Sequence, residues 1–193
     1  MNLPCSPRTA ALTALLGVCL ACRAPAALAG ASGTVETRPN PCGAGSTAVC
    51  STIINARLNI DDVAIGHVGA IFVVVLPTNA KGVPLTTKGA YATRAGWSVG
   101  IQPAAYYTGP LPILYTIQTA IPGGICARAA KYTQAHRFSV FAGYGVAPTS
   151  GPGALHVDPN LPASAMAPLR TAAAAAAMVR AHTVWRIGGI TCG

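Results

Sequence analysis

The chain has 193 residues, of which 52% are hydrophobic and 9% are charged, and its formal net charge is +9 at pH 7. This length is enough for one domain with a real core. The basic residues occur singly, without the run or the aromatic-interleaved cluster of a nucleic-acid groove, which argues against a specific nucleic-acid site. The low charge, with 21 Gly and 16 Pro, indicates a surface of low polarity that a partner or an assembly could cover.

Residues 1–29 are predicted to be an export signal. A basic start precedes an apolar segment at 10–20, and Ala27-Leu28-Ala29 forms a small-residue cleavage site. The apolar segment is too short to span a bilayer. Acylation of Cys22 is the alternative, although Cys19 stands where a bulky aliphatic residue is usual. We therefore expect a secreted or periplasmic chain, lipid-anchored in the alternative, with no transmembrane span after cleavage.

Four cysteines remain after cleavage, namely Cys42, Cys50, Cys126 and Cys192. An even number in an exported chain predicts two disulfides, and the three connectivities stay open. No CxxC pair and no histidine at ligand spacing accompanies them, so we expect no zinc and no other cofactor. Residues 30–50 are rich in Gly, Pro, Ser, Thr and Asn and are predicted to be a flexible arm with a disulfide loop. Residues 51–193 then form one domain.

Short runs of β-branched and aromatic residues predict a mostly β chain. The predicted strands lie at 52–60, 71–76, 83–87, 89–93, 97–101, 113–121, 138–146 and 184–190. The continuously apolar run at 71–76, within the stretch 66–77, fits a central strand packed on both faces. Turn residues at 78–82 predict a hairpin with 83–87 as the return strand. Gly143 and Gly145 indicate a bulge or a close backbone approach.

One helix is predicted late in the chain, from Pro168 to about Arg180, with an apolar face at helical spacing. Its six consecutive alanines favour a helix but offer little area to bury, so it should lie close to a sheet. The fold class is therefore an antiparallel β-sandwich-like domain with one late Ala-rich α-helix at about 168–180.

The stretch Gly96-Trp97-Ser98-Val99-Gly100 matches the G-x-S-x-G elbow of serine hydrolases, and Asp158 and His182 follow in the order Ser, Asp, His. The elbow needs a helix directly after the serine, which Pro103 opposes. The alternating strands and helices of that fold are also missing. A serine hydrolase is therefore the disfavoured alternative, and Ser98 is expected to be an ordinary strand residue.

Asp61, Asp62 and His67 are the nearest approach to a metal corner, but calcium needs six or more oxygen ligands and the chain has only four acidic residues. We interpret them as a solvated turn. The remaining histidines, His136, His156 and His182, are not grouped by spacing. No phosphate loop or paired carboxylates are visible, so we expect no enzyme and no catalytic residue.

Aromatic residues with polar groups are the usual anchors of carbohydrate or protein recognition. Tyr91, Trp97 and Tyr115 lie near predicted strands, and the last two are expected to serve the core. Tyr106 and Tyr107 are adjacent in a predicted loop, so at least one ring must be exposed. These two residues are the candidate binding surface.

The order of features from residue 66 to about 190 resembles an uncharacterised group of secreted or lipid-anchored bacterial β modules. The residues that carry the resemblance are Val68-Gly69, the run 71–77, Gly96-Trp97, the stretch 106–112, the stretch 140–145 and the strand 184–187. The resemblance implies a β-sandwich-like extracellular domain and no activity. The cysteines, the Pro-rich loop after Gly145 and the alanine helix depart from the group.

These observations predict a structural or binding domain of the cell envelope without catalytic activity, with an envelope protein or polysaccharide as partner. The alternative is a subunit of a surface filament or adhesin, in which the arm at 30–40 would add a strand to a neighbour. That arm lacks the alternating apolar residues of a donor strand.

Overall fold

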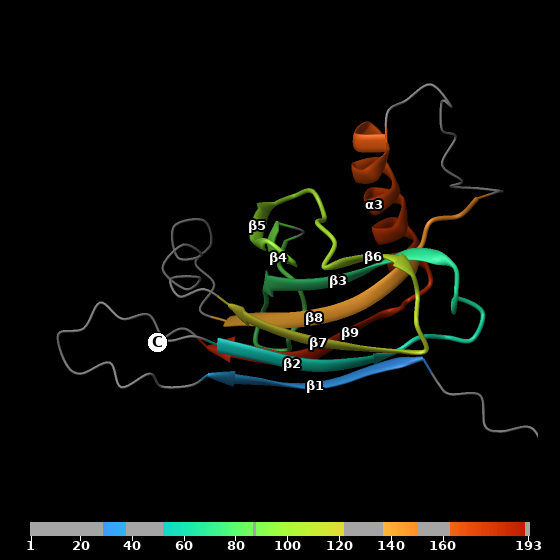
Figure 1. Ribbon diagram of the computed structural model, residues 1–193. Coiled ribbons are helices and arrows are strands. Elements are labelled where there is room, and N and C mark those ends of the chain that lie inside the picture. The colour runs from blue at the N-terminus through green and yellow to red at the C-terminus, as the bar shows by residue number, and fades with distance from the viewer. Residues whose placement is uncertain (1–28, 38–51, 87, 122–136, 150–162, 192–193) are drawn as a thin grey trace, which may run out of the picture.

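The computed structural model describes residues 29–37, 52–86, 88–121, 137–149 and 163–191. Two antiparallel sheets and one helix occupy this part of the chain (Figure 1). The predicted fold class, a β-sandwich-like domain with a single late helix, is confirmed. The four cysteines and residues 1–28 of the predicted signal lie outside the described residues.

The smaller sheet has three strands in the order β1-β2-β7. They are β1 (Gly30–Thr37), β2 (Thr52–Asn59) and β7 (Leu114–Ile121). Burial alternates along β2, where Ile54 and Leu58 are buried and Arg57 is exposed. Such alternation places one face on the core and the other in solvent, as the sequence predicts for this strand.

The larger sheet runs in the order β5-β4-β3-β8-β9. Its strands are β3 (Val68–Pro77), β4 (Gly89–Thr93), β5 (Gly96–Gly100), β8 (Arg137–Val146) and β9 (Val184–Thr191). A sixth strand, β6 (Tyr107–Pro110), pairs with the first residues of β3. Nearly every residue of β3 is buried, which confirms the predicted central strand packed on both faces.

The core fills the space between the two sheets. Its large, fully buried side chains include Ile54, Leu58, Ile117 and Ile121 from the smaller sheet and Ile71, Val73, Val75 and Val140 from the larger one. Tyr144 is buried with them, and its hydroxyl oxygen accepts a hydrogen bond from the Asp61 amide at 2.9 Å. The predicted turn at Asp61 is thus tied to the core.

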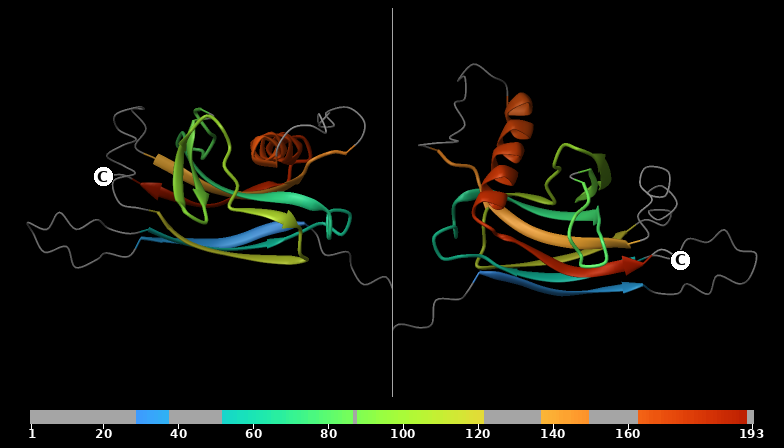
Figure 2. Two further views of the ribbon diagram at one scale, coloured as in Figure 1. Left: turned by 45° about the horizontal axis from the view of Figure 1, so that its top comes forward. Right: turned by 180° about the vertical axis from the view of Figure 1, so that it is seen from behind.

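The helix α3 (Ala163–Arg180) lies on the outer face of the larger sheet (Figure 2). It contacts β8 where two glycines replace side chains. A Cβ at Gly145 would overlap the carbonyl oxygen of Ala174, and one at Gly143 would lie 2.7 Å from Met178 Sδ. The close backbone approach expected at these glycines is confirmed, whereas the bulge lies at Val140/Phe141. The alanine helix lies close to the sheet, as predicted.

The structure corrects the predicted start of this helix. It begins at Ala163, so Pro168 lies inside the helix and not at its first turn. A proline in this position cannot donate a hydrogen bond to the carbonyl group four residues earlier. In the residues before the proline, Met166 is only 8% exposed, so this first part of the helix is packed.

The first eight residues of the predicted flexible arm form the strand β1. All of them pair with β2, from Gly30 opposite Asn59 to Thr37 opposite Thr52. The hydrogen bonds of this pairing come from the backbone. The strand therefore forms although its small and polar side chains show no alternating apolar pattern in the sequence. Gly33 lets the two strands pack closely, since a Cβ there would lie 2.8 Å from Ala56 Cα.

The predicted hairpin partner of β3 is also corrected. Asn79 Oδ1 accepts hydrogen bonds from the amides of Lys81 and Val83, at 2.9 and 3.0 Å, and so forms the expected turn. Residues 83–86 add only a single bridge between Thr78 and Pro84. Two hydrogen bonds flank this bridge, from the Asn79 amide to the Val83 carbonyl oxygen at 3.0 Å and from the Leu85 amide to the Pro77 carbonyl oxygen at 2.9 Å. Within the described residues, no further bridge continues it. The return strand is β4, which pairs with Val74 and Val75.

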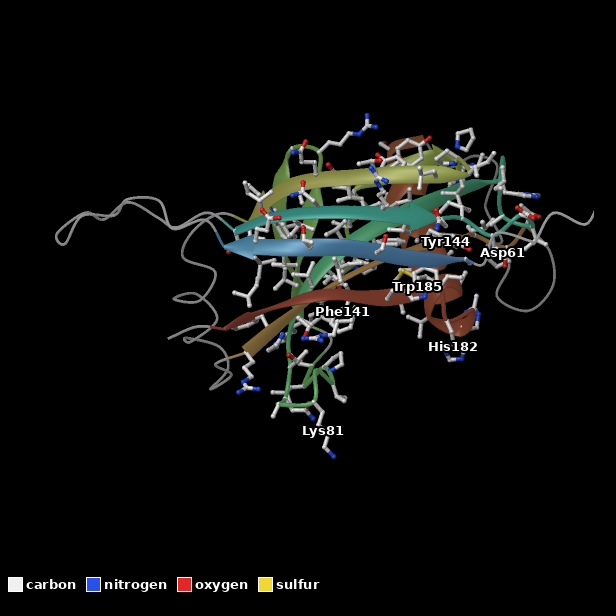
Figure 3. The ribbon with its side chains drawn as sticks, turned by 90° about the horizontal axis from the view of Figure 1, so that it is seen from below. Asp61, Lys81, Phe141, Tyr144, His182 and Trp185 are labelled. Atoms are coloured by element: carbon white, nitrogen blue, oxygen red, sulfur yellow. The ribbon has the colours of Figure 1, made fainter. Side chains whose placement is uncertain are left out.

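The strands β1 and β9 are the ends of the two sheets and lie side by side (Figures 1 and 3). Val35 packs on Gly188, where an added Cβ would lie 2.6 Å from Val35 Cγ2. This contact closes one side of the sandwich. Within the described residues, no helix has the length and hydropathy required to span a bilayer.

Candidate functional site

An aromatic cluster lies between the two sheets at the edge where β6 and the β4–β5 turn of the larger sheet meet β7 of the smaller sheet. It consists of Tyr106 directly before β6, Tyr107 as the first residue of β6, Tyr115 from β7, and Arg94 from the turn between β4 and β5. The ring centroids of Tyr107 and Tyr115 are 5.0 Å apart, and those of Tyr106 and Tyr115 are 6.4 Å apart at an interplanar angle of 87°. The Arg94 guanidinium carbon lies 5.6 Å from the centroid of the Tyr107 ring.

The polar groups of the aromatic side chains hold this side of the sandwich closed. The Tyr106 hydroxyl donates to the Gln118 carbonyl oxygen at 3.1 Å, and Trp97 Nε1 donates to the Ala120 carbonyl oxygen at 2.8 Å. Gln118 and Ala120 are two residues apart on β7, so their carbonyl groups point to the same edge of this strand. The aromatic side chains therefore cap an edge that would otherwise be open to pairing.

The charge of the cluster comes from Arg94. A side-chain hydrogen bond with Tyr115, followed by the electrostatic influence of the tyrosines, raises the pKa of the Arg94 guanidinium. The group is fully exposed and stays positively charged. A guanidinium over a tyrosine face is a favourable cation–π arrangement, which holds it beside the rings.

The tyrosines and Trp97 are each half-buried, so they present parts of their rings to solvent. The Tyr107 hydroxyl is also engaged, because it donates to the Pro110 carbonyl oxygen at 2.9 Å. Next to Tyr115 in the sequence, Ile113 and Leu114 are 65% and 49% exposed. This surface can bind a partner through contact with the aromatic rings and through the hydrogen-bond donors of Arg94. Among its described residues there is no pair of side chains that could act as general acid and general base.

The structure brings together the two tyrosines that the sequence selected. Both pack on the core and both remain partly exposed, and Tyr107 belongs to a short strand. Tyr115 and Arg94 were not predicted to join them. In the sequence, Tyr115 is one residue of an alternating strand, and Arg94 is a single basic residue two positions before Gly96. Neither pattern indicates a contact with Tyr106 or Tyr107. Tyr91 lies half-buried on β4, where burial raises the pKa of its hydroxyl.

The G-x-S-x-G stretch forms the strand β5 and continues into residues 101–106, which are not helical. Ser98 pairs with Tyr91 in a regular antiparallel register and is exposed. His182 follows α3 directly before β9, so β4, β3 and β8 separate the strands that adjoin these two residues. Asp158 lies outside the described residues. The strand-to-helix elbow of a serine hydrolase is therefore not formed here.

Asp61, Asp62 and His67 lie in the exposed turn before β3. The amide of His67 donates to the Ala64 carbonyl oxygen at 3.2 Å, as in a tight turn. Among the residues that the structure describes, no three His, Cys, Asp or Glu side chains gather as a metal site would require. His136 and His156 lie outside this part of the chain.

Comparisons of the chain with protein-family models, with curated proteins and with solved structures gave no match. The resemblance to the bacterial β modules therefore stays a prediction. A function has to be argued from the surface itself.

Proposed function

We propose that the chain is an exported, non-catalytic binding domain of the cell envelope and that the aromatic cluster is its contact surface. The observation that carries the proposal is the exposed Arg94 guanidinium, whose central carbon lies over the Tyr107 ring at 5.6 Å from its centroid. A cation fixed beside partly exposed rings is already in place to receive a partner. Such preorganisation lowers the entropy lost on binding.

The partner that fits this surface best is an envelope polysaccharide. The hydroxyls of Tyr106 and Tyr107 are engaged by carbonyl groups of the protein, so these residues offer mainly ring surface. Sugar rings have apolar C–H faces that pack on aromatic rings, and their hydroxyls accept hydrogen bonds from a guanidinium. The alternative partner is an envelope protein, which the same binding experiment can reveal.

The variant Arg94→Gln tests the proposal. This variant removes the cation beside Tyr107. We expect its affinity for purified cell-wall polysaccharide, measured by co-sedimentation, to fall about fivefold to tenfold, which corresponds to about 1 to 1.4 kcal/mol of binding free energy. The control is Arg57→Gln, which removes the same charge from an exposed position on β2. Equal losses in the two variants would show that only net charge matters. If the wild-type protein does not bind the polysaccharide but binds an envelope protein, the partner is a protein and the polysaccharide assignment is wrong.

A second candidate, a self-assembling surface subunit, is favoured by the strand β5. This strand ends the order of the larger sheet, has neither charge nor proline, and leaves Val99 67% exposed, with Ile101 after it 61% exposed. Edge strands of this kind are prone to pair with another chain. An antiparallel copy centred on Ser98 would set Gly96 opposite Gly100 and Trp97 opposite Val99. The route through a free arm is weaker, since residues 30–37 already pair with β2.

Light scattering at rising protein concentration separates the two candidates. A subunit should associate through β5, and Val99→Lys should abolish the association because a buried charge at this edge is unfavourable. Val63→Lys, in a turn where the side chain is 80% exposed, is the control that should leave the association unchanged. A chain that stays monomeric throughout would contradict the subunit candidate.

A further inference from the structure

A second polar site lies on the outer face of the larger sheet, away from the aromatic cluster. Ser139 of β8 and Thr78 at the end of β3 are buried, at 1% and 4% exposure, and their hydroxyl oxygens are 3.1 Å apart. Arg186 of β9 donates from Nε to Ser139 Oγ at 3.0 Å. A buried hydroxyl pair thus fixes the position of an exposed arginine.

Two glycines make room for the Arg186 guanidinium. A Cβ at Gly82 would lie 3.1 Å from its Nε, and a Cβ at Gly189 would lie 2.9 Å from its Nη2. The turn that contains Gly82 crosses the strands β8 and β9 on this face (Figure 2). With Nε engaged by Ser139, the N–H groups of the two Nη atoms remain as a donor fork. A fork of this kind matches the oxygens of a phosphate or carboxylate group.

Two further cations belong to the same corner. Arg137 lies two residues before Ser139 on β8, and its carbonyl oxygen accepts a hydrogen bond from the Thr78 amide at 3.0 Å. Lys81 precedes Gly82 in the turn and extends away from the body of the molecule (Figure 3). Both side chains are exposed. The two elements that adjoin Arg186, the start of β8 and the turn at Gly82, therefore each add an exposed positive charge.

The acidic residues that the structure describes do not balance these charges. Asp61 and Asp62 are at the other end of the sheet, where Asp61 adjoins Tyr144 (Figure 3). Glu36 is on β1, and its Oε1 accepts a hydrogen bond from Thr34 Oγ1 at 3.3 Å. Strand alternation places Thr34 and Glu36 on the face of β1 opposite to Val35, which packs on β9.

We infer that Arg186, held by Ser139, which Thr78 contacts in turn, and accompanied by Arg137 and Lys81, binds a phosphate-type oxyanion. The Arg186 fork supplies directed donors, and the two flanking cations supply attraction that suits more than one negative charge. The inference does not depend on the aromatic cluster. A purely structural role, in which Arg186 only holds the turn onto the sheet, would give no anion binding.

Titration of the oxidised chain with inorganic phosphate, followed by amide chemical shifts at constant ionic strength, tests the inference. We expect saturable shifts at Ser139, Gly82 and Gly189, and a Kd raised at least about tenfold in Arg186→Gln. Arg57→Gln, which removes an equal charge from the smaller sheet, should change the Kd less than about twofold. Acetate in place of phosphate shows whether a carboxylate suffices.

Shifts that fail to saturate, or equal effects of Arg186→Gln and Arg57→Gln, would overturn the site. Arg186→Lys keeps the charge but loses the fork, and it should bind phosphate more weakly than the wild type. If Arg186→Gln does not fold, the double variant Lys81→Gln/Arg137→Gln decides, because both side chains are exposed. An unchanged Kd in that variant contradicts the inference. This outcome is separate from the polysaccharide result at Arg94.

Discussion

Gly143 and Gly145 determine how closely α3 approaches the larger sheet. They face Ala174 and Met178, so the contact is between backbone and small side chains on both elements. Little apolar area is available in such a contact, and its stability depends on close packing over a long stretch. Any added atom must therefore move the helix.

The variant Gly145→Ala should lower the free energy of unfolding by about 2 to 3 kcal/mol, because its Cβ would overlap the Ala174 carbonyl oxygen. The matched control is Gly100→Ala on β5, where the nearest atom to an added Cβ is Gln102 N at 3.9 Å. That change should stay within about 0.5 kcal/mol. Urea denaturation measures both, and equal effects would mean that α3 does not lie on β8 in solution.

The two residue-level features differ in how far the sequence could predict them. Gly143 and Gly145 break a strand pattern, and such a break predicts either a bulge or a close approach, of which the second is observed. Tyr106 and Tyr107 are adjacent, so their partial exposure was predictable. The contact of Tyr115 and Arg94 with them joins β7 to the β4–β5 turn, and no local pattern encodes a contact between distant elements.

Among the elements, α3 shows a direct conflict between sequence signal and tertiary contact. Its Pro168 lacks the hydrogen needed to bond the carbonyl group of Ser164, yet the helix continues on both sides. Replacing the proline with Ala restores the donor and removes the ring clash. We expect Pro168→Ala to raise the free energy of unfolding by about 1 kcal/mol or more.

The control for this prediction is Pro103→Ala, in the non-helical segment before β6. It has the same effect on the unfolded chain and should lower stability by about 0.4 to 1 kcal/mol. Thermal unfolding of both variants distinguishes the cases. If Pro168→Ala behaves like Pro103→Ala, the helix starts at about residue 168, as the sequence alone indicates.

Strands with an apolar alternation or run were predictable, and strands held by backbone pairing were not. The strands β2, β3, β7, β8 and β9 lie within a few residues of their predicted ranges. In contrast, β1 and β6 consist of Gly, Thr, Ser and Pro among a few larger residues, a composition typical of loops. The backbone of a neighbouring strand supplies their hydrogen bonds, and that neighbour is far away in the sequence.

At the scale of the whole molecule, 13 basic residues face 4 acidic ones. Repulsion among like charges destabilises the compact state, and salt screens it, since the Debye length falls from about 30 Å at 0.01 M to about 8 Å at 0.15 M. We expect the Tm to rise by about 2 to 4 °C between these concentrations of sodium chloride. Scanning calorimetry measures the change, and a Tm that falls would indicate that attractive ion pairs dominate.

The pairing of strands that are distant in the sequence also governs how fast the fold can form. Thr52 is opposite Ile121 in the smaller sheet, and Gly69 is opposite Val146 in the larger one, so neither sheet is complete until most of the chain is available. Folds dominated by such non-local contacts are slow to form. Slow folding would leave time for the export that we propose, because a translocation channel accepts an unfolded chain.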